Sequence, residues 1–362
     1  MKSINILIKQ NYIELLDKCY YVEDTFDINQ NDVALNEILK LDIFGSISVS
    51  ESINLNQCFE IRVISNKEEK TFYSPVCRFY KDKFYTDLKD MFLYYDRVYI
   101  KDELLSIAET DDYEDLVLNY GFKPVYKIIY EMNFGFELEI SCGSESNLQF
   151  LIKSLIEQDL LRNNEIILKK DNSIQGAYPV EIITAPNNIK RTYELAIQLS
   201  DIFKKFDSTA KGHNMGGMHI HCSYSIDNIK TLKLINFIYN RANLDFITKI
   251  AQRSNNMYCE YIISNITDSL GFINLSLDKN FKLLNLNRYS ALNFTRHTIE
   301  FRIFNSNLRR ERLLKNINFV ESILSFISSK DYTENNKDFK SFVNKSRKYK
   351  YLKEFIKYLN EQ

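Results

Sequence analysis

The chain has 362 residues, of which 45% are hydrophobic, 26% charged and 14% aromatic. This is an ordinary globular composition, and the length leads us to expect two or three domains. Lys and Arg total 47 against 48 Asp and Glu, for a net charge of −1. The balance therefore lacks the strongly basic character of a nucleic-acid binder.

The sequence also gives no sign of a membrane or secreted protein. No basic start is followed by an apolar run, and no window approaches the roughly 18 apolar residues of a membrane span. The six cysteines are scattered without a CxxC pair, which argues against a zinc ribbon or a disulfide framework. We therefore expect a cytoplasmic protein that binds no membrane and no nucleic acid. Its richness in Asn, Ile, Lys and Tyr suits an AT-rich bacterial or phage genome.

The first 125 residues carry no recognisable chemical motif. Strand candidates such as SINILI and CFEIRVIS accompany helical pieces such as DVALNEILKLDIF. The segment from Tyr120 to Ile128 contains Gly121 and Pro124, which tend to interrupt helices and strands. We place a domain boundary there and expect a smaller N-terminal α+β domain over residues 1–125, an accessory domain through which a partner could dock.

The pattern is clearer over residues 126–330. Alternating apolar positions predict strands at KIIYEMNFGFELEI, YPVEIITAP, GGMHIHCSY, RYSALNF and HTIEFRIF. Helical spacing predicts helices at ESNLQFLIKSLIEQDLL, KRTYELAIQLSDIFKKF, IKTLKLINFIYNRANLDFITKIAQ and RRERLLKNINFVESILSFIS, the third as one long helix. Several strands are short and could pair antiparallel. A Lys-rich tail over residues 331–362 ends in a helix candidate, KYLKEFIKYLNEQ.

Four of these strands carry chelating or cationic side chains among apolar ones. Successive side chains on a strand point to opposite faces, so in NFGFELEIS the Phe, Leu and Ile residues share one face and the glutamates the other. The same separation holds in GGMHIHCSY and HTIEFRIF, and a glutamate interrupts the apolar run PVEII. The side chains concerned, strand by strand, are Glu137 and Glu139; Glu181; His219 and His221; Glu300 and Arg302.

Each pair has a plainer explanation when it is taken alone. A single Glu-x-Glu is more often a solvated sheet face, and Glu300 with Arg302 could be a surface pair of little energetic value. Solvent-facing strands, however, usually mix Lys, Thr, Ser and Gln with Glu, whereas these positions hold only groups that bind metal or phosphate. Carboxylates with little imidazole favour Mg²⁺ or Mn²⁺ over Zn²⁺. Several glutamates around such ions indicate a polyanionic ligand, above all ATP, although the sequence has no phosphate-binding glycine loop.

The ordered set FGFELEI, DNS…VEIITAP, GGMHIHCS, R…YC, RYSALNF and TIEFRIF resembles the amidoligase family. That family belongs to the carboxylate–amine ligase superfamily, typified by glutamine synthetase and glutamate–cysteine ligases. The resemblance covers roughly Ile128 to Ile327. It implies an α+β fold in which a curved antiparallel sheet, a glutamine synthetase-like half-barrel, carries helices on its outer face. It also implies that the polar concave face holds ATP and Mg²⁺ or Mn²⁺.

The resemblance assigns a role to each matching residue. The implied metal ligands are Glu137, Glu139, Glu181, His219 and Glu300. The implied nucleotide-phosphate contacts are His221, Arg253 and Arg302, and the implied catalytic residues are Arg302, Glu300 and Arg288. Asp171 and Ser173 match a small turn motif to which we assign no role.

The implied reaction is the ATP-dependent joining of a carboxylate to an amine through an acyl phosphate. The carboxylate could belong to a small molecule, a peptide or a protein. Three other hypotheses remain open: a guanidino-kinase-like phosphotransferase on the same fold, a non-catalytic nucleotide-binding or interaction protein, and a zinc hydrolase using His213, His219 and His221. His213 and His297 lie off the paired pattern, and we interpret both as structural.

Overall fold

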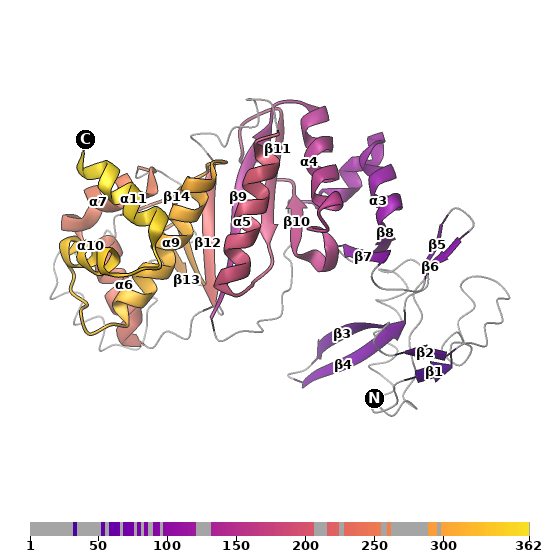
Figure 1. Cartoon of the computed structure of the whole chain (residues 1–362), viewed down its shortest axis with the longest axis horizontal. Coiled ribbons are helices and arrows are strands. Elements are labelled where there is room, and N and C mark those ends of the chain that lie inside the picture. The colour runs from indigo at the N-terminus through magenta and orange to yellow at the C-terminus, as the bar shows by residue number, and fades with distance from the viewer. Residues whose placement is uncertain are drawn as a thin grey trace. The chain divides into compact units, whose positions relative to one another are not determined.

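The computed structural model (Figure 1) describes the chain in segments. These are residues 32–34, 52–54, 58–65, 68–75, 78–80, 83–85, 90–94, 97–120, 132–205, 216–223, 228–254, 259–261, 289–294 and 298–361. The chain forms two compact units, the first made of Met1–Leu116 with Ile152–Ile167 and the second of Val117–Leu151 with Leu168–Gln362. The domain boundaries predicted near residues 125 and 330 stay predictions.

The first unit consists of antiparallel hairpins and short helical segments. The hairpins pair β1 (Asp32–Ala34) with β2 (Ser52–Asn54), β3 (Cys58–Ser65) with β4 (Glu68–Pro75), β5 (Arg78–Tyr80) with β6 (Lys83–Tyr85), and β7 (Met91–Tyr94) with β8 (Arg97–Ile100). The helical segments are α3 (Lys101–Ala108), η3 (Asp111–Leu116) and η4 (Arg162–Asn164).

Two sequence predictions in this unit have different outcomes. The strand predicted at CFEIRVIS is confirmed as β3. The helix predicted from Asp32 is wrong over Asp32–Ala34, because these residues pair with Ser52–Asn54, a partner that local apolar spacing does not reveal. The predicted strand SINILI lies outside the described residues.

The main sheet has six antiparallel strands in the order β10-β11-β9-β12-β14-β13. Their bounds are β9 (Asn133–Cys142), β10 (Ile166–Lys169), β11 (Tyr178–Thr184), β12 (Gly217–Ser223), β13 (Leu292–Phe294) and β14 (Ile299–Asn305). Among the described strands, β10 and β13 at the two edges are not paired with each other, so the sheet is open. The predicted α+β class is confirmed, whereas the likeness to a glutamine synthetase half-barrel stays a prediction.

One face of this sheet is the apolar core that the sequence predicts. On β9 the side chains of Phe134, Phe136, Leu138 and Ile140 are at most 1% exposed. The same face continues through fully buried residues of the neighbouring strands, namely Met218, Ile220, Phe301 and Ile303. Because strand side chains alternate, burying these residues sends the intervening glutamates and histidines to the other face.

Helices cover the apolar face. In Figure 1, α5 (Ile189–Phe203) and α9 (Arg310–Ile327) lie across the sheet. The hydroxyl of Thr192 on α5 donates to the carbonyl of Phe134 on β9 at 3.2 Å. The amide of Asn316 on α9 lies 3.3 Å from the sulfur of Met218 on β12. Both helices, and α4 (Glu145–Glu157), form where the apolar spacing predicts them.

The long helix predicted over residues 229–252 is wrong, because the structure has two helices there. They are α6 (Asn228–Tyr239) and α7 (Arg241–Ala251). Asn240 between them is extended, and its side chain accepts a hydrogen bond from Ala242 N at 2.9 Å. Asparagine is a favoured N-cap residue, so a cap inside a continuous apolar pattern starts a second helix.

The tail forms two more helices, α10 (Asn336–Lys345) and α11 (Lys350–Asn360). The second is the predicted C-terminal helix, whereas the sequence analysis missed α10. Phe339 of α10 packs among aromatic rings, with centroids 5.2 Å from that of Phe237 and 5.7 Å from that of Phe319. The tail is therefore part of the core that supports α9.

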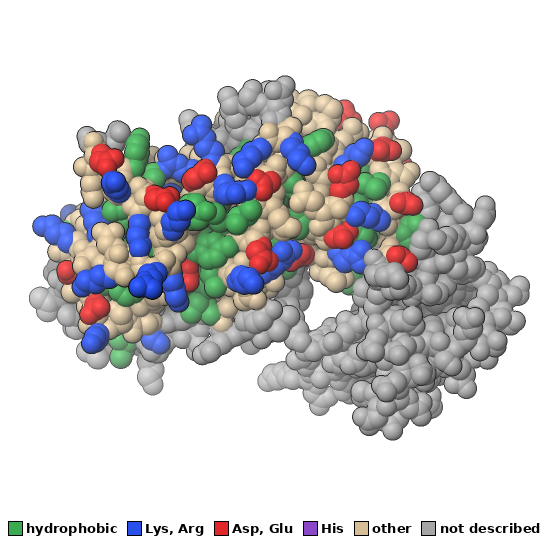
Figure 2. Space-filling view, in the orientation of Figure 1, with side chains coloured by type: hydrophobic (Ala, Val, Ile, Leu, Met, Phe, Trp, Pro, Cys, Tyr) green, Lys and Arg blue, Asp and Glu red, His purple; other side chains and the backbone are tan. Residues whose placement is uncertain are grey.

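The exterior carries charges of both signs. Figure 2 shows Lys and Arg side chains interspersed with Asp and Glu over helices α9 to α11. Within the described residues, every helix is too short or too polar to cross a lipid bilayer.

Candidate functional site

The polar face of the sheet is carried by the neighbouring strands β11, β9, β12 and β14. Their registers place three pairs of candidate side chains directly opposite each other: Glu181 and Glu139, Glu137 and His219, and His221 and Glu300. Side chains opposed in this way have Cβ atoms about 4.5–5.5 Å apart. Side chains from four distant segments therefore lie together, and we call these six residues the carboxylate–histidine cluster.

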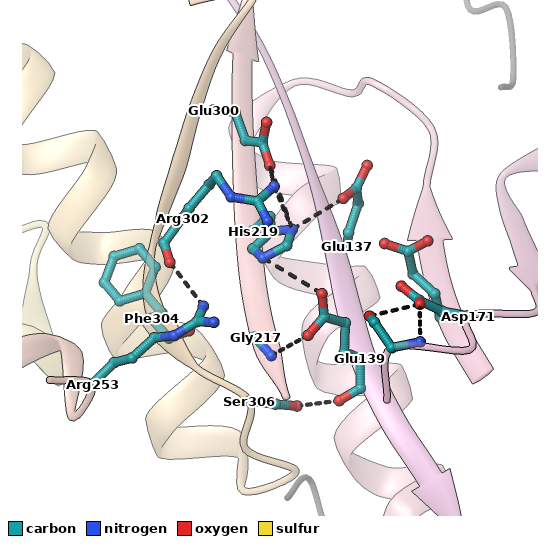
Figure 3. Close-up of polar contacts among 12 residues, drawn as sticks. Glu137, Glu139, Asp171, Gly217, His219, Arg253, Glu300, Arg302, Phe304 and Ser306 are labelled. Carbon is teal, nitrogen blue, oxygen red and sulfur yellow. Dashed lines mark hydrogen bonds and ion pairs between the residues drawn. The ribbon is translucent and has the colours of Figure 1, made fainter. Parts of the chain in front are cut away.

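His219 lies at the centre of this cluster (Figure 3). Its Nδ1 atom is 3.2 Å from Glu137 Oε2 and 3.4 Å from Glu300 Oε1, and its Nε2 atom is 3.6 Å from Glu139 Oε1. The side chain is 3% exposed. Among the described residues its Nε2 atom makes no hydrogen bond. The buried Nε2 atom thus faces the Glu139 carboxylate without a hydrogen bond, while Nδ1 lies between two other carboxylates.

Glu300 links this centre to the candidate arginine. Arg302 Nη1 forms an ion pair with Glu300 Oε1 and lies 3.5 Å from His219 Nδ1. The other carboxylate oxygen of Glu300 accepts a hydrogen bond from Asn293 Nδ2 at 2.7 Å. Asn293, on β13, is a contact that sequence reasoning missed, because a single polar residue in a three-residue edge strand carries no periodic signal.

His221 reaches Glu137 across a position that has no side chain. Its Nε2 atom is 3.2 Å from Glu137 Oε1, and the residue opposite it on β9 is Gly135. A Cβ atom at Gly135 would lie 3.2 Å from the carbonyl oxygen of Thr184, which is closer than nearly all real contacts. The close approach of β11 therefore explains why glycine occupies this position.

Glu139 is fixed at the opposite end of the cluster by the start of β12. Its carboxylate accepts a hydrogen bond from Gly217 N, and its carbonyl accepts one from Ser306 Oγ at 2.6 Å. A Cβ atom at Gly217 would lie 2.6 Å from Arg253 Nη1 and 2.7 Å from His219 Nε2. Gly217 therefore leaves the space that these two polar groups occupy.

Arg253 follows α7 and is tied to the backbone of β14. Its Nη1 atom donates to the carbonyl of Arg302 at 2.9 Å and approaches that of Phe304 at 3.4 Å. The residue is buried. The other predicted arginine, Arg288, lies outside the described residues, as do His213 and His297.

Lys169, which the sequence analysis did not single out, lies at the acidic end of the cluster. Its ammonium forms an ion pair with Glu181 Oε2. Asp171, two residues later, accepts hydrogen bonds on Oδ1 from Ser173 N at 2.8 Å and Ser173 Oγ at 2.7 Å. The turn motif noted in the sequence thus fixes a buried carboxylate near Glu181. Because β10 is an unbroken apolar run before Lys169, it shows no alternation of apolar and polar residues that would have indicated the position of this lysine.

The imidazoles lower the pKa values of two carboxyl groups. Burial alone raises the pKa of Glu137, but the neighbouring His221 and His219 outweigh it and bring the pKa well below its usual value. Burial likewise opposes ionisation of Glu300, and His219, His221 and Arg302 together lower its pKa. Both groups therefore favour the carboxylate form, which is the form that binds metals.

Two other groups shift upward. Burial lowers the pKa of His221, but the charges of Glu137 and Glu300 outweigh it and raise the pKa to about 9. Burial and the negative charge of Glu137 raise the pKa of Glu181 to about 8, against the opposing effect of Lys169. Both upward shifts include the negative charge of Glu137, which a bound cation would offset.

The donor set fits a divalent cation. Three groups have ligand atoms within 4.8 Å of one another: Glu137 with His221 and Glu300, Glu137 with Glu181 and His219, and Glu139 with Asp171 and Glu181. Most donors are carboxylate oxygens, which suit Mg²⁺ and Mn²⁺. The buried Nε2 atom of His219, which has no hydrogen bond among the described residues, adds one donor compatible with Mn²⁺.

Comparison with known proteins agrees with the resemblance read from the sequence. Residues 154–324 match the family model described as "Putative amidoligase enzyme". The predicted amidoligase resemblance is thereby confirmed over these residues. No curated protein matches the chain. The segment includes the candidate residues of β11, β12 and β14, whereas Glu137 and Glu139 on β9 precede it.

Proposed function

We propose that the polar face of the sheet is the active site of an ATP-dependent ligase that joins a carboxylate to an amine. The observation that carries the proposal is the convergence of Glu137, His219 and Glu300 beside Arg302 in a chain with an amidoligase-family segment. Carboxylates and an arginine around one point are what phosphoryl transfer from a nucleotide requires.

The cluster residues would hold Mg²⁺ or Mn²⁺. Glu137, His221 and Glu300 form one candidate ligand group, and the groups that include Glu181 form the others. A bound ion would neutralise negative charge on the transferring phosphoryl oxygens.

Arg302 would supply a fixed positive charge to the same phosphoryl group. Its ion pair with Glu300 holds the guanidinium beside His219, so little reorganisation is needed as charge develops. Arg253 is held by the carbonyls of Arg302 and Phe304 next to the start of β12, and we propose that it contacts a nucleotide phosphate. His221, on the same face, is the other proposed phosphate contact.

The proposed reaction has two steps. A carboxylate oxygen of the substrate attacks the γ-phosphorus of ATP, the bond to the β-phosphate oxygen breaks, and ADP leaves. An amine nitrogen then attacks the acyl phosphate, expels phosphate and loses a proton, which leaves an amide. The carboxylate and amine could belong to small molecules, peptides or proteins.

Hydroxylamine trapping tests this proposal. The protein is incubated with ATP, Mn²⁺, hydroxylamine and a panel of amino-acid and peptide carboxylates. We expect a hydroxamate together with stoichiometric ADP, and neither from the Glu137→Gln variant. Phosphorylation of a guanidine substrate without hydroxamate would favour the phosphotransferase alternative. Absence of both ATP binding and Mn²⁺ binding in calorimetry would favour a non-catalytic protein.

A further inference from the structure

Lys169 is a cation at the acidic end of the candidate site, and the proposed ligase reaction gives it no role. It is the last residue of β10, after the buried Ile166–Leu168 run. Its side chain is 16% exposed, and that of its partner Glu181 is 4% exposed. An ion pair this buried has lost much of its solvation, a cost that only close, well-oriented polar partners offset.

The partner of Lys169 belongs to a group of three carboxylates. Ligand oxygens of Glu139, Asp171 and Glu181 lie within 4.8 Å of one another. The first is fixed by its hydrogen bond from Gly217 N, and Asp171 is fixed by both polar groups of Ser173. These carboxylates are held close by the fold, so their mutual repulsion calls for a cation among them.

In the structure, the Lys169 ammonium is a cation in contact with this group, through its ion pair with Glu181. A divalent ion bound by the same oxygens would lie close to the ammonium, and the two cations would repel each other in this poorly solvated site. Glu181 also belongs to the group with Glu137 and His219, whereas the group of Glu137, His221 and Glu300 does not include it. The conflict with Lys169 is therefore confined to the ligand groups built on Glu181.

We propose that Lys169 competes with a divalent cation for Glu181: the ammonium neutralises the carboxylate group in the metal-free protein and is displaced when the ion enters. This inference rests on the proposed function, because it concerns how the same site takes up its metal. Lys169 then limits metal affinity where Glu181 is a ligand, and it leaves the metal affinity of the Glu137, His221 and Glu300 group unchanged.

Manganese titration by calorimetry, without ATP, tests the competition. Lys169→Met should tighten Mn²⁺ binding at one class of sites by about tenfold or more, because close charge pairs contribute at least about that much to binding. Lys169→Arg keeps the charge and should bind like the wild type. Lys249→Met is the control, since it removes a lysine from an exposed ion pair with Asp245, 2.8 Å long, on α7.

Unchanged or weaker Mn²⁺ binding by Lys169→Met would overturn this inference while leaving the ligase proposal standing. A wild-type protein that binds no Mn²⁺ would overturn both. A second measurement needs no variant: amine acylation of the wild type, read by peptide mass spectrometry, with and without Mn²⁺. Modification of Lys169 should increase severalfold when Mn²⁺ is present, because the displaced ammonium loses its carboxylate partner. Equal or reduced modification would contradict the displacement.

Discussion

His219 and Glu137 lie directly opposite each other on β12 and β9, with Nδ1 and Oε2 3.2 Å apart. The two residues are 82 positions apart in the chain, so the pairing of the strands brings them together. The apolar side chains that alternate with them are buried on the other face. The sheet is therefore stabilised by one face and presents its chemistry on the other.

Replacing a cluster carboxylate should abolish function and preserve the fold. We expect Glu137→Ala, Glu139→Ala or Glu300→Ala to remove ATP turnover, because each takes away a candidate metal ligand. The fold should survive, because each substitution also removes repulsion among neighbouring carboxylates, which offsets much of the stability lost with the carboxylate's own ion pairs and hydrogen bonds. Circular dichroism and thermal melting should show a folded protein. Glu109→Ala, which removes the exposed partner of Lys153, is the control and should keep activity. Unfolding of all three cluster variants would indicate structural roles instead.

The sequence predicts the strands of this site well and its surroundings poorly. Period-two alternation in β9, β12 and β14 separates core from cluster without any knowledge of partners. The contribution of Lys169 was not predictable, since its contact with Glu181 depends on β10 adding to the sheet edge. The break between α6 and α7 was missed because Asn240 caps a helix inside an uninterrupted apolar pattern. Local periodicity predicts faces, whereas edges, caps and cross-strand contacts depend on the assembled fold.

Gly217→Ala should damage the site through steric contact alone. The added Cβ would lie 2.6 Å from Arg253 Nη1 and 2.7 Å from His219 Nε2, so both of these groups, or the strand itself, must move. We expect a loss of about 1–3 kcal/mol in the free energy of unfolding and weaker Mn²⁺ binding. Urea denaturation and calorimetry measure the two effects. Cys222→Ala, on the apolar face of the same strand, should reduce stability without changing Mn²⁺ affinity. Wild-type Mn²⁺ affinity in Gly217→Ala would show that the space is not needed.

Asn318 should stabilise the C-terminal helix from outside it. Tyr349, the residue before α11, makes no side-chain cap. Instead, the Asn318 side-chain oxygen on α9 accepts hydrogen bonds from Tyr351 N at 3.2 Å and Leu352 N at 3.4 Å. Asn318→Ala should therefore cost at least the usual value of a cap, about 0.5–2 kcal/mol in the free energy of unfolding, because it also removes the hydrogen bond that Asn318 Nδ2 donates to the Tyr193 hydroxyl. Urea denaturation measures it. Thr248→Ala, which removes a hydroxyl bonded within its own helix, should cost less; equal costs would deny Asn318 this role.

Lys315 should make the free energy of unfolding depend on pH in the alkaline range. Burial, with a smaller effect of Arg312, lowers its pKa well below the usual lysine value. Because the folded state then binds fewer protons than the unfolded state, stability is greatest above the unfolded pKa of about 10.4. It falls as the pH drops from there to the folded pKa.

Lys315→Met removes this linkage. The difference in unfolding free energy between wild type and variant should therefore shift in favour of the wild type as the pH rises toward 10, by about 1.4 kcal/mol for each unit of pKa shift. Urea denaturation of both proteins at matched pH values isolates this group from the tyrosines, which both proteins share. A difference that stays constant with pH would show that the ammonium keeps its ordinary pKa in the fold.

The most direct test of the central claim is ATP binding measured by calorimetry with and without Mn²⁺. The account predicts that wild-type protein binds ATP when Mn²⁺ is present, that omitting the metal abolishes most of this binding, and that Glu137→Gln and Glu300→Gln lose it. Metal-independent ATP binding, or undiminished binding by both variants, would contradict the assignment of the carboxylate–histidine cluster as the site of metal-assisted phosphoryl transfer.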